Sequence, residues 1–181
     1  MSISRSLRVR LVRSQLKEVG KGMTLGPHFV VRGGRYITIG DDFHSGRDTT
    51  IGAWDRYQGE TFHPRIVIGR GVRINAGAYI SAINSITIGN DVLFGRNVLI
   101  VDNNHGRGCV EEIDIPPAQR KLYSRGPVVI EDNVWLGEGV AVMPGVRIGY
   151  SAIIGAHSVV TGDIPARCVA VGSPARVIKH L

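Results

Sequence analysis

The sequence predicts an all-β fold, a parallel β-helix in which the chain winds repeatedly around one axis. The first observation is a period of six, because the last third divides into six-residue blocks that each open with Ile, Leu or Val. The second is that the same six-residue spacing recurs near residues 39–51, 68–80 and 88–105. The third is glycine, which is present at 24 of 181 positions and is scattered through apolar sequence. A period of six fits neither an isolated α-helix nor a simple hairpin sheet.

The blocks define the geometry of one coil. Six of them follow one another without a gap: Ile130-EDNVW, Leu136-GEGVA, Val142-MPGVR, Ile148-GYSAI, Ile154-GAHSV and Val160-TGDIP. Three blocks make one triangular coil of about eighteen residues, and neighbouring coils stack at roughly the 4.8 Å spacing of strands. The aliphatic residue that opens each block is predicted to point into the axis. Gly, Asn and Asp are predicted near the corners, where φ is often positive.

The repeat divides the chain into three regions. These are a basic N-terminal segment and cap at 1–36, the β-helix at 37–165, and a tail at 166–181 that folds back along the helix. The triplet 86–88 shifts the phase by two residues, so the coil there is expected to be irregular. Segments near 53–65 and 106–127 also interrupt the repeat. We interpret both as loops extruded from corners, because irregular segments of that length are usually functional or disordered.

The N-terminal segment fits two kinds of structure. Leu7, Val9 and Leu11 alternate with arginines, which is typical of a strand, whereas Ile3, Leu7 and Leu11 are spaced by four, which is typical of a helix. A cap over the open first coil is favoured, because the end of a solenoid exposes unpaired strands. Peripheral association with an anionic membrane or a lipid-linked acceptor stays open as the second interpretation.

Composition excludes several classes of protein. No apolar run approaches the roughly 18 residues of a membrane span, and the basic start lacks the apolar core of a secretory signal. The two cysteines lie in no paired motif, so neither a disulfide framework nor a cysteine zinc site is expected. A cytoplasmic location is the default expectation, with the inner face of the membrane as an alternative. The net charge is +7, but aromatic residues make up only 6% and no recognition helix is evident, so nucleic acid is not an expected partner.

Three segments carry a resemblance to a known family: Pro127-VVIEDNVWLG, Ile153-IGAHSVVTGDIP and the closing Val171-GSPARVIK. From about Ile37 to Ile178 the chain resembles the hexapeptide-repeat acyltransferase superfamily. The order and spacing of the segments are most similar to the sugar, maltose and galactoside O-acetyltransferases, including those that modify capsules and lipopolysaccharides. The resemblance implies a left-handed coil and a homotrimer with active sites between subunits. It also implies transfer of an acetyl group from acetyl-CoA to a hydroxyl of a sugar or surface-polysaccharide precursor.

The candidate catalytic residue is His105. Histidine suits a general base because its side chain changes charge near neutral pH. His105 ends the block that begins at Ile100, where an ordered coil gives way to the loop at 106–127. A rigid scaffold beside a mobile cover is the setting that a catalytic base requires. The resembling enzymes carry their catalytic histidine at this place.

The candidate acceptor-binding residues are the polar side chains around His105 and in the preceding coils. They are Asp102, Asn103, Asn104, Asn75 and Asn84. Amide and carboxylate groups can orient an imidazole or bind sugar hydroxyls, and the same residue types also form turns. The resemblance implies an acceptor-binding Asn near residues 75–84, although the local sequence NAGAYISAINS departs from the usual pattern.

The candidate donor-binding residues follow from the resemblance, which places coenzyme A along the later coils in a groove between subunits. They are Ala141, Ala156, Ser158, Thr161, Arg176 and Lys179. A guanidinium or an ammonium pairs well with the phosphates of the adenosine end. Gly162 stands where the related enzymes often have Lys, so one phosphate contact is expected to be missing.

Four further residues have smaller expected roles. Trp135 is interpreted as packing at a coil corner, and His157 as a residue that narrows the donor groove or points into solvent. His63 lies in a loop that could approach the acceptor. Cys109 is close to His105, but direct transfer needs no acyl-cysteine.

Three alternatives compete with sugar O-acetylation. A zinc-dependent carbonic anhydrase on the same fold needs three histidine ligands, and positions 100 and 110 hold Ile and Val, so no metal is expected. A non-enzymatic binding solenoid would show regular ladders of exposed Thr or other ligands, which are missing. Transfer to an amine, on an amino-sugar nucleotide or on serine, stays open because a histidine base serves both reactions.

Overall fold

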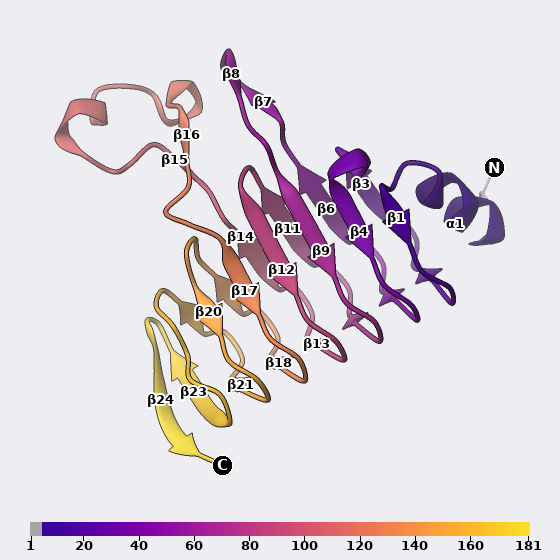
Figure 1. Cartoon of the computed structure of the whole chain (residues 1–181). Coiled ribbons are helices and arrows are strands. Elements are labelled where there is room, and N and C mark those ends of the chain that lie inside the picture. Colours follow the sequence, from indigo (N-terminus) through magenta and orange to yellow (C-terminus); the bar gives the residue numbers. More distant parts are fainter. Residues whose placement is uncertain (1–4) are drawn as a thin grey trace.

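The computed structural model describes residues 5–181 and winds them into a triangular stack of coils (Figure 1). Three sheets of parallel strands run along its length, and each turn of the chain adds one strand to each sheet. The helix at residues 5–13 lies at one end of the stack and the C-terminus at the other. The predicted all-β solenoid is confirmed.

The strands of the three sheets are as follows, in spatial order. Sheet 1 contains β1 (Glu18–Val19), β4 (Ile37–Ile39), β9 (Arg65–Ile68), β12 (Ser85–Ile88), β17 (Val128–Ile130) and β20 (Arg147–Ile148). Sheet 2 contains β2 (Thr24–Leu25), β5 (His44–Ser45), β10 (Arg73–Ile74), β13 (Leu93–Phe94), β18 (Trp135–Leu136), β21 (Ile153–Ile154), β23 (Cys168–Gly172) and β24 (Ala175–His180). Sheet 3 contains β3 (Val30–Arg32), β6 (Thr50–Ala53), β11 (Tyr79–Ala82), β14 (Leu99–Val101), β19 (Ala141–Val142) and β22 (Val159–Val160).

The length of a coil changes along the stack. Ile130 of β17 pairs with Ile148 of β20, 18 positions later, as the repeat predicts. Nearer the N-terminus, Ile66 of β9 pairs with Ile86 of β12, 20 positions later. The β1–β4 and β2–β5 pairs have the same spacing of 20. The two-residue phase shift before 86–88 is therefore the rule for complete N-terminal coils without an extruded loop, and not a local irregularity.

The core is a stack of the residues that open each block. Ile130, Leu136, Val142, Ile148 and Ile154 are all fully buried, which confirms the predicted inward direction. Burying one such side chain stabilises the fold by about 1.5–3 kcal/mol, so the repeat accounts for a large share of the packing energy. Because each residue sits on its equivalent one coil away, the coils form one continuous column.

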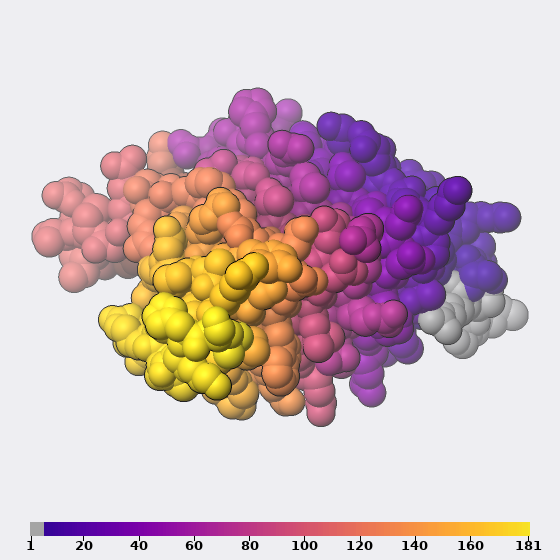
Figure 2. Space-filling view, turned by 60° about the horizontal axis from the view of Figure 1, so that its bottom comes forward, coloured from indigo at the N-terminus to yellow at the C-terminus, as the bar shows by residue number. Residues whose placement is uncertain are grey.

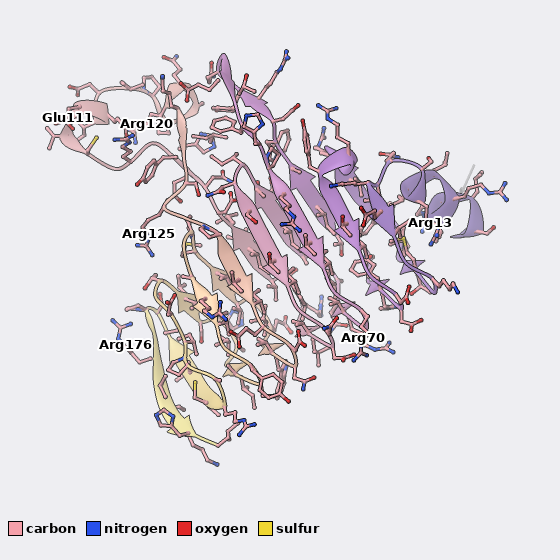
Figure 3. All side chains as sticks on the ribbon, in the orientation of Figure 1. Arg13, Arg70, Glu111, Arg120, Arg125 and Arg176 are labelled. Atoms are coloured by element: carbon pink, nitrogen blue, oxygen red, sulfur yellow. The ribbon has the colours of Figure 1, made fainter. Side chains whose placement is uncertain are left out.

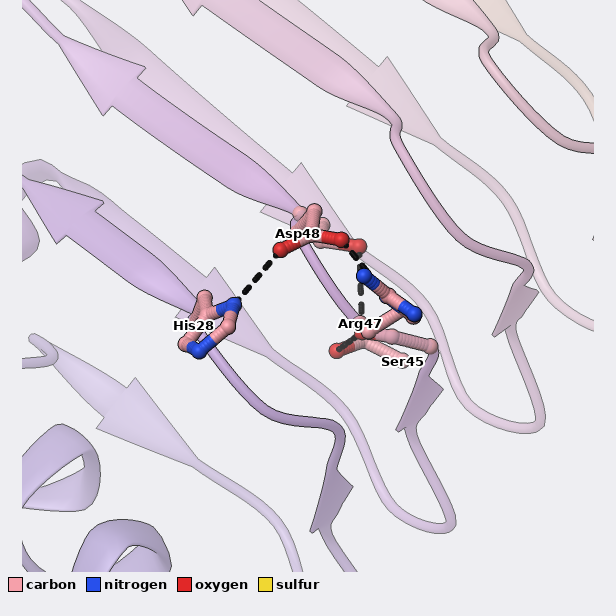
Figure 4. A network of polar contacts seen from close by, with 6 residues as sticks. His28, Ser45, Arg47 and Asp48 are labelled. Atoms are coloured by element: carbon pink, nitrogen blue, oxygen red, sulfur yellow. Dashed lines mark hydrogen bonds and ion pairs between the residues drawn. The ribbon is translucent and has the colours of Figure 1, made fainter. Parts of the chain in front are cut away.

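The corners use residues that tolerate a positive φ. His28 and Asp48 both adopt φ of 55° at successive corners, and Figure 4 shows their side chains meeting. Nδ1 of His28 lies 2.7 Å from Oδ1 of Asp48, and Nε of Arg47 donates to Oδ2 of Asp48 at 2.7 Å. Hydrogen bonds from Arg47 and His28 lower the pKa of Asp48 below its usual value. The corner thus adds a polar ladder outside the apolar core.

A corner substitution tests the importance of the positive φ. Asn97 has φ of 55°, a conformation that costs most L-residues about 1–2 kcal/mol. We expect Asn97→Ala to lower the free energy of unfolding by about 1 kcal/mol and Asn97→Gly to be close to neutral. Thermal denaturation of both variants at one protein concentration measures the difference. Equal losses in the two variants would show that the backbone conformation is not the cause.

The two ends of the stack are covered differently. The ambiguous N-terminal segment is a helix, α1 (Arg5–Arg13), which packs on the first coil through Val12 and Val9. The tail after Ala166 forms β23 and β24, of which β23 pairs in parallel with β21 and β24 pairs antiparallel with β23. The tail therefore extends sheet 2 by two strands. It does not fold back along the helix, because backbone pairing with the exposed edge of β21 is available at the end of the stack.

Two extruded segments leave the body on the same side. The first is a hairpin of β7 (Arg56–Tyr57) and β8 (Glu60–Thr61). The second begins with β15 (Asn104–His105), passes the short 3₁₀ turns η2 (Val110–Glu112) and η3 (Pro117–Gln119), and returns through β16 (Leu122–Tyr123). A further 3₁₀ turn, η1 (Gly34–Tyr36), follows β3. Figure 2 shows the segment at 106–121 projecting from the body.

Candidate active site

A pocket of about 290 Å³ lies on sheet 3, where the two extruded segments meet it. It is lined by Trp54, Tyr57, Tyr79, Ser81, Val101, Asn103, His105 and Leu122. Aromatic side chains form much of the wall, and the polar groups are the Ser81 hydroxyl, the Asn103 amide, the His105 imidazole and the polar ends of the Trp and Tyr side chains. No Lys, Arg, Asp or Glu lines it.

The strand register explains how distant residues reach this pocket. Tyr79 and Ser81 lie two positions apart on β11, so both point to the outer face of sheet 3. Ser81 is paired with Val101 on β14, and Trp54 directly follows β6 on the other side of β11. The guanidinium carbon of Arg32 lies 5.7 Å from the ring centroid of Trp54, which helps to hold that ring in place.

His105 is held between the hairpin and the long loop. Its Nδ1 lies 3.4 Å from the hydroxyl of Tyr57, and the two rings meet edge to face at 5.4 Å. The Tyr57 hydroxyl also donates to the carbonyl of Ala118 at 2.7 Å. The side chain of Lys121 forms an ion pair with Glu60 of the hairpin. These contacts dock the loop on the hairpin directly beside the imidazole.

Asp102 supports the segment that carries His105 from beneath. Its side chain is 0% exposed, and its two oxygens accept the backbone N–H groups of Ile83 and Asn84, both at 2.9 Å. The Asn103 amide donates to the same carboxylate at 3.0 Å. Burial raises the pKa of Asp102, and the hydrogen bonds oppose that rise. Asp102 thus ties the turn after β11 to the start of the long loop and does not line the pocket, in contrast to its predicted contact with the acceptor.

The predicted acceptor-binding amides separate into different places. Asn103 lines the pocket, with its Nδ2 committed to Asp102 and to the carbonyl of Ser81 at 3.2 Å. The Asn84 side chain donates to the hydroxyl of Ser124 at 3.3 Å, and Asn104 is exposed on β15. Asn75 lies on sheet 2, in a different hollow. Only Asn103 of these amides therefore lines the hollow that contains His105.

The remaining histidines lie elsewhere. His28 and His157 are corner residues with positive φ, and Nδ1 of His44 lies 2.6 Å from the hydroxyl of Thr24. His63 lines a separate trough on sheet 1 beside Arg35. His180 lies in β24 at the end of the stack. Within residues 5–181, His105 is thus the histidine that combines an aromatic pocket with a hydrogen-bonded ring.

A second hollow of about 480 Å³ lies on sheet 2. It is lined by Asn75, Leu93, Phe94, Gly95, Trp135, Gly137, Glu138, Ile153, Ile154, Gly155 and Ala156. Trp135 is 49% exposed here, so it is not packed away at a corner as the sequence predicts. Ala156, a predicted donor contact, is the small residue at the rim of this hollow.

The other predicted donor residues are spread over the last coils. Ala141 lies on the outer face of sheet 3 in a row with Leu99 and Val159, and Thr161 is exposed just after that sheet ends. Ser158 is fully buried, donates to the carbonyl of Gly155 and accepts the N–H of Gly172. Its side chain therefore cannot reach a ligand on the surface.

The cationic candidates lie on the tail and at the end of the long loop. Arg176 and Lys179 are exposed on β24, and Figure 3 shows Arg176 projecting outward. Arg125, which ends the long loop, donates to the carbonyl of Thr161 at 2.9 Å. A guanidinium thus lies next to a predicted donor residue, a feature that the repeat pattern did not predict.

The described residues give little support to catalysis by a cysteine nucleophile or by a bound metal ion. Hydrogen bonding to Glu111, with burial adding to it, raises the pKa of Cys109, so the thiol stays protonated and is a poor nucleophile. Across residues 5–181 no three His, Cys, Asp or Glu side chains form a group that could hold a metal ion. In the same range, no helix has the length and apolar character needed to cross a membrane.

Sequence patterns missed the aromatic part of the pocket. Trp54 and Tyr57 lie in a segment recognised only as an interruption, and Tyr79 occupies an outward strand position inside a regular block. The signal that could have found them is the gathering of two aromatic residues in a loop that breaks the repeat, followed by a third at an outward position.

The chain is similar to a known transferase family and to proteins named as O-acetyltransferases. Residues 127–162 match the family described as "Bacterial transferase hexapeptide (six repeats)". A putative lipopolysaccharide biosynthesis O-acetyl transferase of Escherichia coli is 39% identical over 153 residues, which is 82% of this chain and 74% of that protein. A maltose O-acetyltransferase from Clostridium difficile is 28% identical, with a TM-score of 0.58 over 100% of this chain and 78% of that chain.

A third similarity concerns the fold alone. The N-acyltransferase AntD from Bacillus cereus is 18% identical, with a TM-score of 0.79 over 99% of this chain and 91% of that chain. These likenesses confirm the left-handed parallel β-helix that the sequence resemblance implies.

Proposed function

The chain belongs to the bacterial transferase hexapeptide family, and on that basis we propose that it transfers an acetyl group from acetyl-CoA to a sugar hydroxyl. The observation that carries the proposal is the placement of His105 in an aromatic, uncharged pocket. The E. coli and C. difficile relatives are named for O-acetyl transfer, in lipopolysaccharide biosynthesis and on maltose. A sugar or surface-polysaccharide precursor is the acceptor class that fits both.

The pocket chemistry supports a neutral sugar ring as the reacting group. Trp54, Tyr57 and Tyr79 offer flat apolar surface for the C–H face of a ring. Asn103 has both its amide donations inside the protein, so its Oδ1 is available to accept a hydrogen bond from a sugar hydroxyl. An ammonium acceptor would find no carboxylate in the pocket wall, which favours hydroxyl over amine transfer.

The reaction proceeds by direct transfer. His105 takes the proton of the acceptor hydroxyl as its oxygen attacks the thioester carbonyl, and the new C–O bond forms. The hydroxyl of Ser81, at the pocket wall, is a donor for the tetrahedral oxyanion. The C–S bond then breaks, and the proton on His105 passes to the leaving sulfur of coenzyme A.

Coenzyme A occupies the surface of the last coils. The outer row on sheet 3 leads away from the pocket past Ala141, a small residue between larger ones, towards Thr161. Arg125, Arg176 and Lys179 supply positive charge for the phosphates near this end. Ala156 lines the neighbouring hollow on sheet 2 and is in place to contact the donor from that side.

Donor binding is testable without knowing the acceptor. Acetyl-CoA at about 100 times its dissociation constant is expected to add about 2.7 kcal/mol to the stability, measured by differential scanning calorimetry. We expect Arg176→Ala to weaken the affinity, measured by titration calorimetry, roughly tenfold, because one charge-assisted contact with phosphate is lost. Arg70→Ala is the matched control, since Arg70 pairs with Asp91 at a corner outside the proposed donor surface. Equal affinities of Arg176→Ala and Arg70→Ala for acetyl-CoA would show that its phosphates bind elsewhere.

The active unit is a homotrimer. Leu93 and Trp135 lie in register on the outer face of sheet 2 and are 41% and 49% exposed, and the projecting loop displays Val110 and Ile113. The neighbouring exposed side chains Leu93 and Trp135 form an apolar surface of the kind that is typical of an interface. Sedimentation is expected to give the mass of three chains for the natural protein, and a smaller mass for Trp135→Glu because a charge is then buried. A natural protein that sediments as a single chain would contradict the proposal.

A further inference from the structure

The hydroxyl of Tyr57 lies between the ring of His105 and a backbone carbonyl. We infer that Tyr57 is a positioning residue that accepts a hydrogen bond from Nδ1–H of His105. This bond holds the imidazole in the Nδ1–H tautomer and leaves the Nε2 lone pair free to take the acceptor's proton. The inference rests on the proposed function for the role of Nε2, but the tautomer itself does not depend on it.

The direction of the hydrogen bond follows from counting protons. A phenol carries one proton and can donate only once. Tyr57 is 2.7 Å from the carbonyl oxygen of Ala118, which can only accept, so the phenolic proton points there. Nδ1 of His105 lies 3.4 Å from the same phenolic oxygen. That contact becomes a hydrogen bond only if Nδ1 supplies the proton.

The carbonyl that fixes this direction is itself held in place. The amide of Gln58 donates to the Ala118 carbonyl at 3.0 Å, and Lys121 pairs with Glu60 across the same junction. Gln58 and Gly59 both have positive φ, 49° and 79°, in the two-residue turn that connects β7 and β8. A two-residue turn of this kind gives a stiff hairpin. The Ala118 carbonyl therefore stays in place to accept the phenolic proton.

The ring of His105 is restrained in a second way. Its backbone pairs with Leu122 across β15 and β16, and its ring meets the Tyr57 ring edge to face with an interplanar angle of 76°. Among residues 5–181, Tyr57 is the side chain that makes a hydrogen bond to this imidazole. Nε2 is therefore uncommitted. In the opposite tautomer Nε2 would already carry a proton and could not act as a base.

The experiment is nitrogen NMR of the full-length protein labelled at histidine, at a pH where the imidazole is neutral. Nδ1 and Nε2 have distinct shifts when protonated, and His105→Gln assigns the signals. We expect the natural protein to show Nδ1–H, and Tyr57→Phe to shift the population towards Nε2–H while keeping the aromatic ring. Tyr150→Phe is the matched control, because it also loses one phenolic hydrogen bond, to Asn133, at a distant corner. Gln58→Gly, which removes one hydrogen bond to the Ala118 carbonyl but keeps the Tyr57 hydroxyl, is expected to give a smaller shift than Tyr57→Phe.

Kinetics provide the second readout. Tyr57→Phe is expected to lower kcat roughly tenfold with the KM for acetyl-CoA unchanged, as for other partners that orient a functional histidine. An Nε2–H tautomer in the natural protein, or the same tautomer and kcat in Tyr57→Phe and Tyr150→Phe, would overturn the inference. A tautomer change in Tyr57→Phe without acetyl transfer to any acceptor would support the positioning and count against the proposed function alone.

Discussion

His105→Ala is expected to lower kcat by about 10² to 10⁴, because transfer then has no base to accept the hydroxyl proton. The KM for acetyl-CoA is expected to change little, since the donor surface lies along other coils. Release of the coenzyme A thiol in the presence of a sugar acceptor measures the rate. The size of this loss separates a chemical role from the modest effect of a surface change.

The control for this substitution is His157→Asn. His157 is a corner residue with φ of 57°, a conformation that Asn also accepts, and its ring lies outside the aromatic pocket. We expect His157→Asn to keep most of the natural rate. A His105→Ala protein that is folded and retains more than about a tenth of the natural kcat would remove His105 from the mechanism.

Asp102→Ala is expected to lower the free energy of unfolding by about 3 kcal/mol. The substitution leaves the buried backbone N–H of Ile83 and the partly buried N–H of Asn84 without their acceptors. It also releases the chain just before His105, so kcat should fall as well. Thermal denaturation and the transfer assay together measure both effects, with exposed Asp114→Ala as the control for loss of a carboxylate.

The same residue predicts a dependence on pH. Burial raises the pKa of Asp102 above its value in the unfolded chain, so the folded protein holds the proton more tightly. The contribution of this group to stability is therefore greatest below the unfolded pKa, about 3.9, and declines as pH rises through the folded pKa. The stability of the Asp102→Asn protein is not expected to show that decline as pH rises. A natural protein whose stability rises with pH relative to that of Asp102→Asn would contradict this assignment.

The sequence predicted the coil well and the site only partly. The six-residue period alone specifies which side chains fill the axis, because one aliphatic position per block stacks on its equivalent in the next coil, as Ile130 and Ile148 do. His105 could be singled out because it stands where the period stops. Trp54 and Tyr57 could not be singled out, because a loop that breaks the period has no strand register from which the direction of its side chains can be predicted.

Residues with two plausible roles were the hardest to place. Asp102 and Ser158 have side chains that suit a ligand, but each is consumed by backbone N–H groups within the fold. Whether a polar residue faces a turn or a pocket depends on contacts with residues of other coils, 14 to 19 positions away for these two, which a local sequence pattern does not report. The secondary structure of the N-terminal segment could not be predicted for a related reason. Its apolar residues fit both the period of a strand and that of a helix, and packing of Val12 on the first coil selects the helix.

Acetyl transfer to a sugar hydroxyl is tested most directly by product analysis with acetyl-CoA labelled with carbon-13 at the carbonyl. The protein is incubated with galactosides, maltose and an amino sugar, and the products are followed by carbon NMR and by the mass of the intact protein. We expect a sugar ester that mild base cleaves, no lasting acetyl group on the protein, and loss of the product signal in His105→Ala. An amide product, or an acetylated protein that accumulates without acceptor, would contradict direct transfer to a sugar hydroxyl.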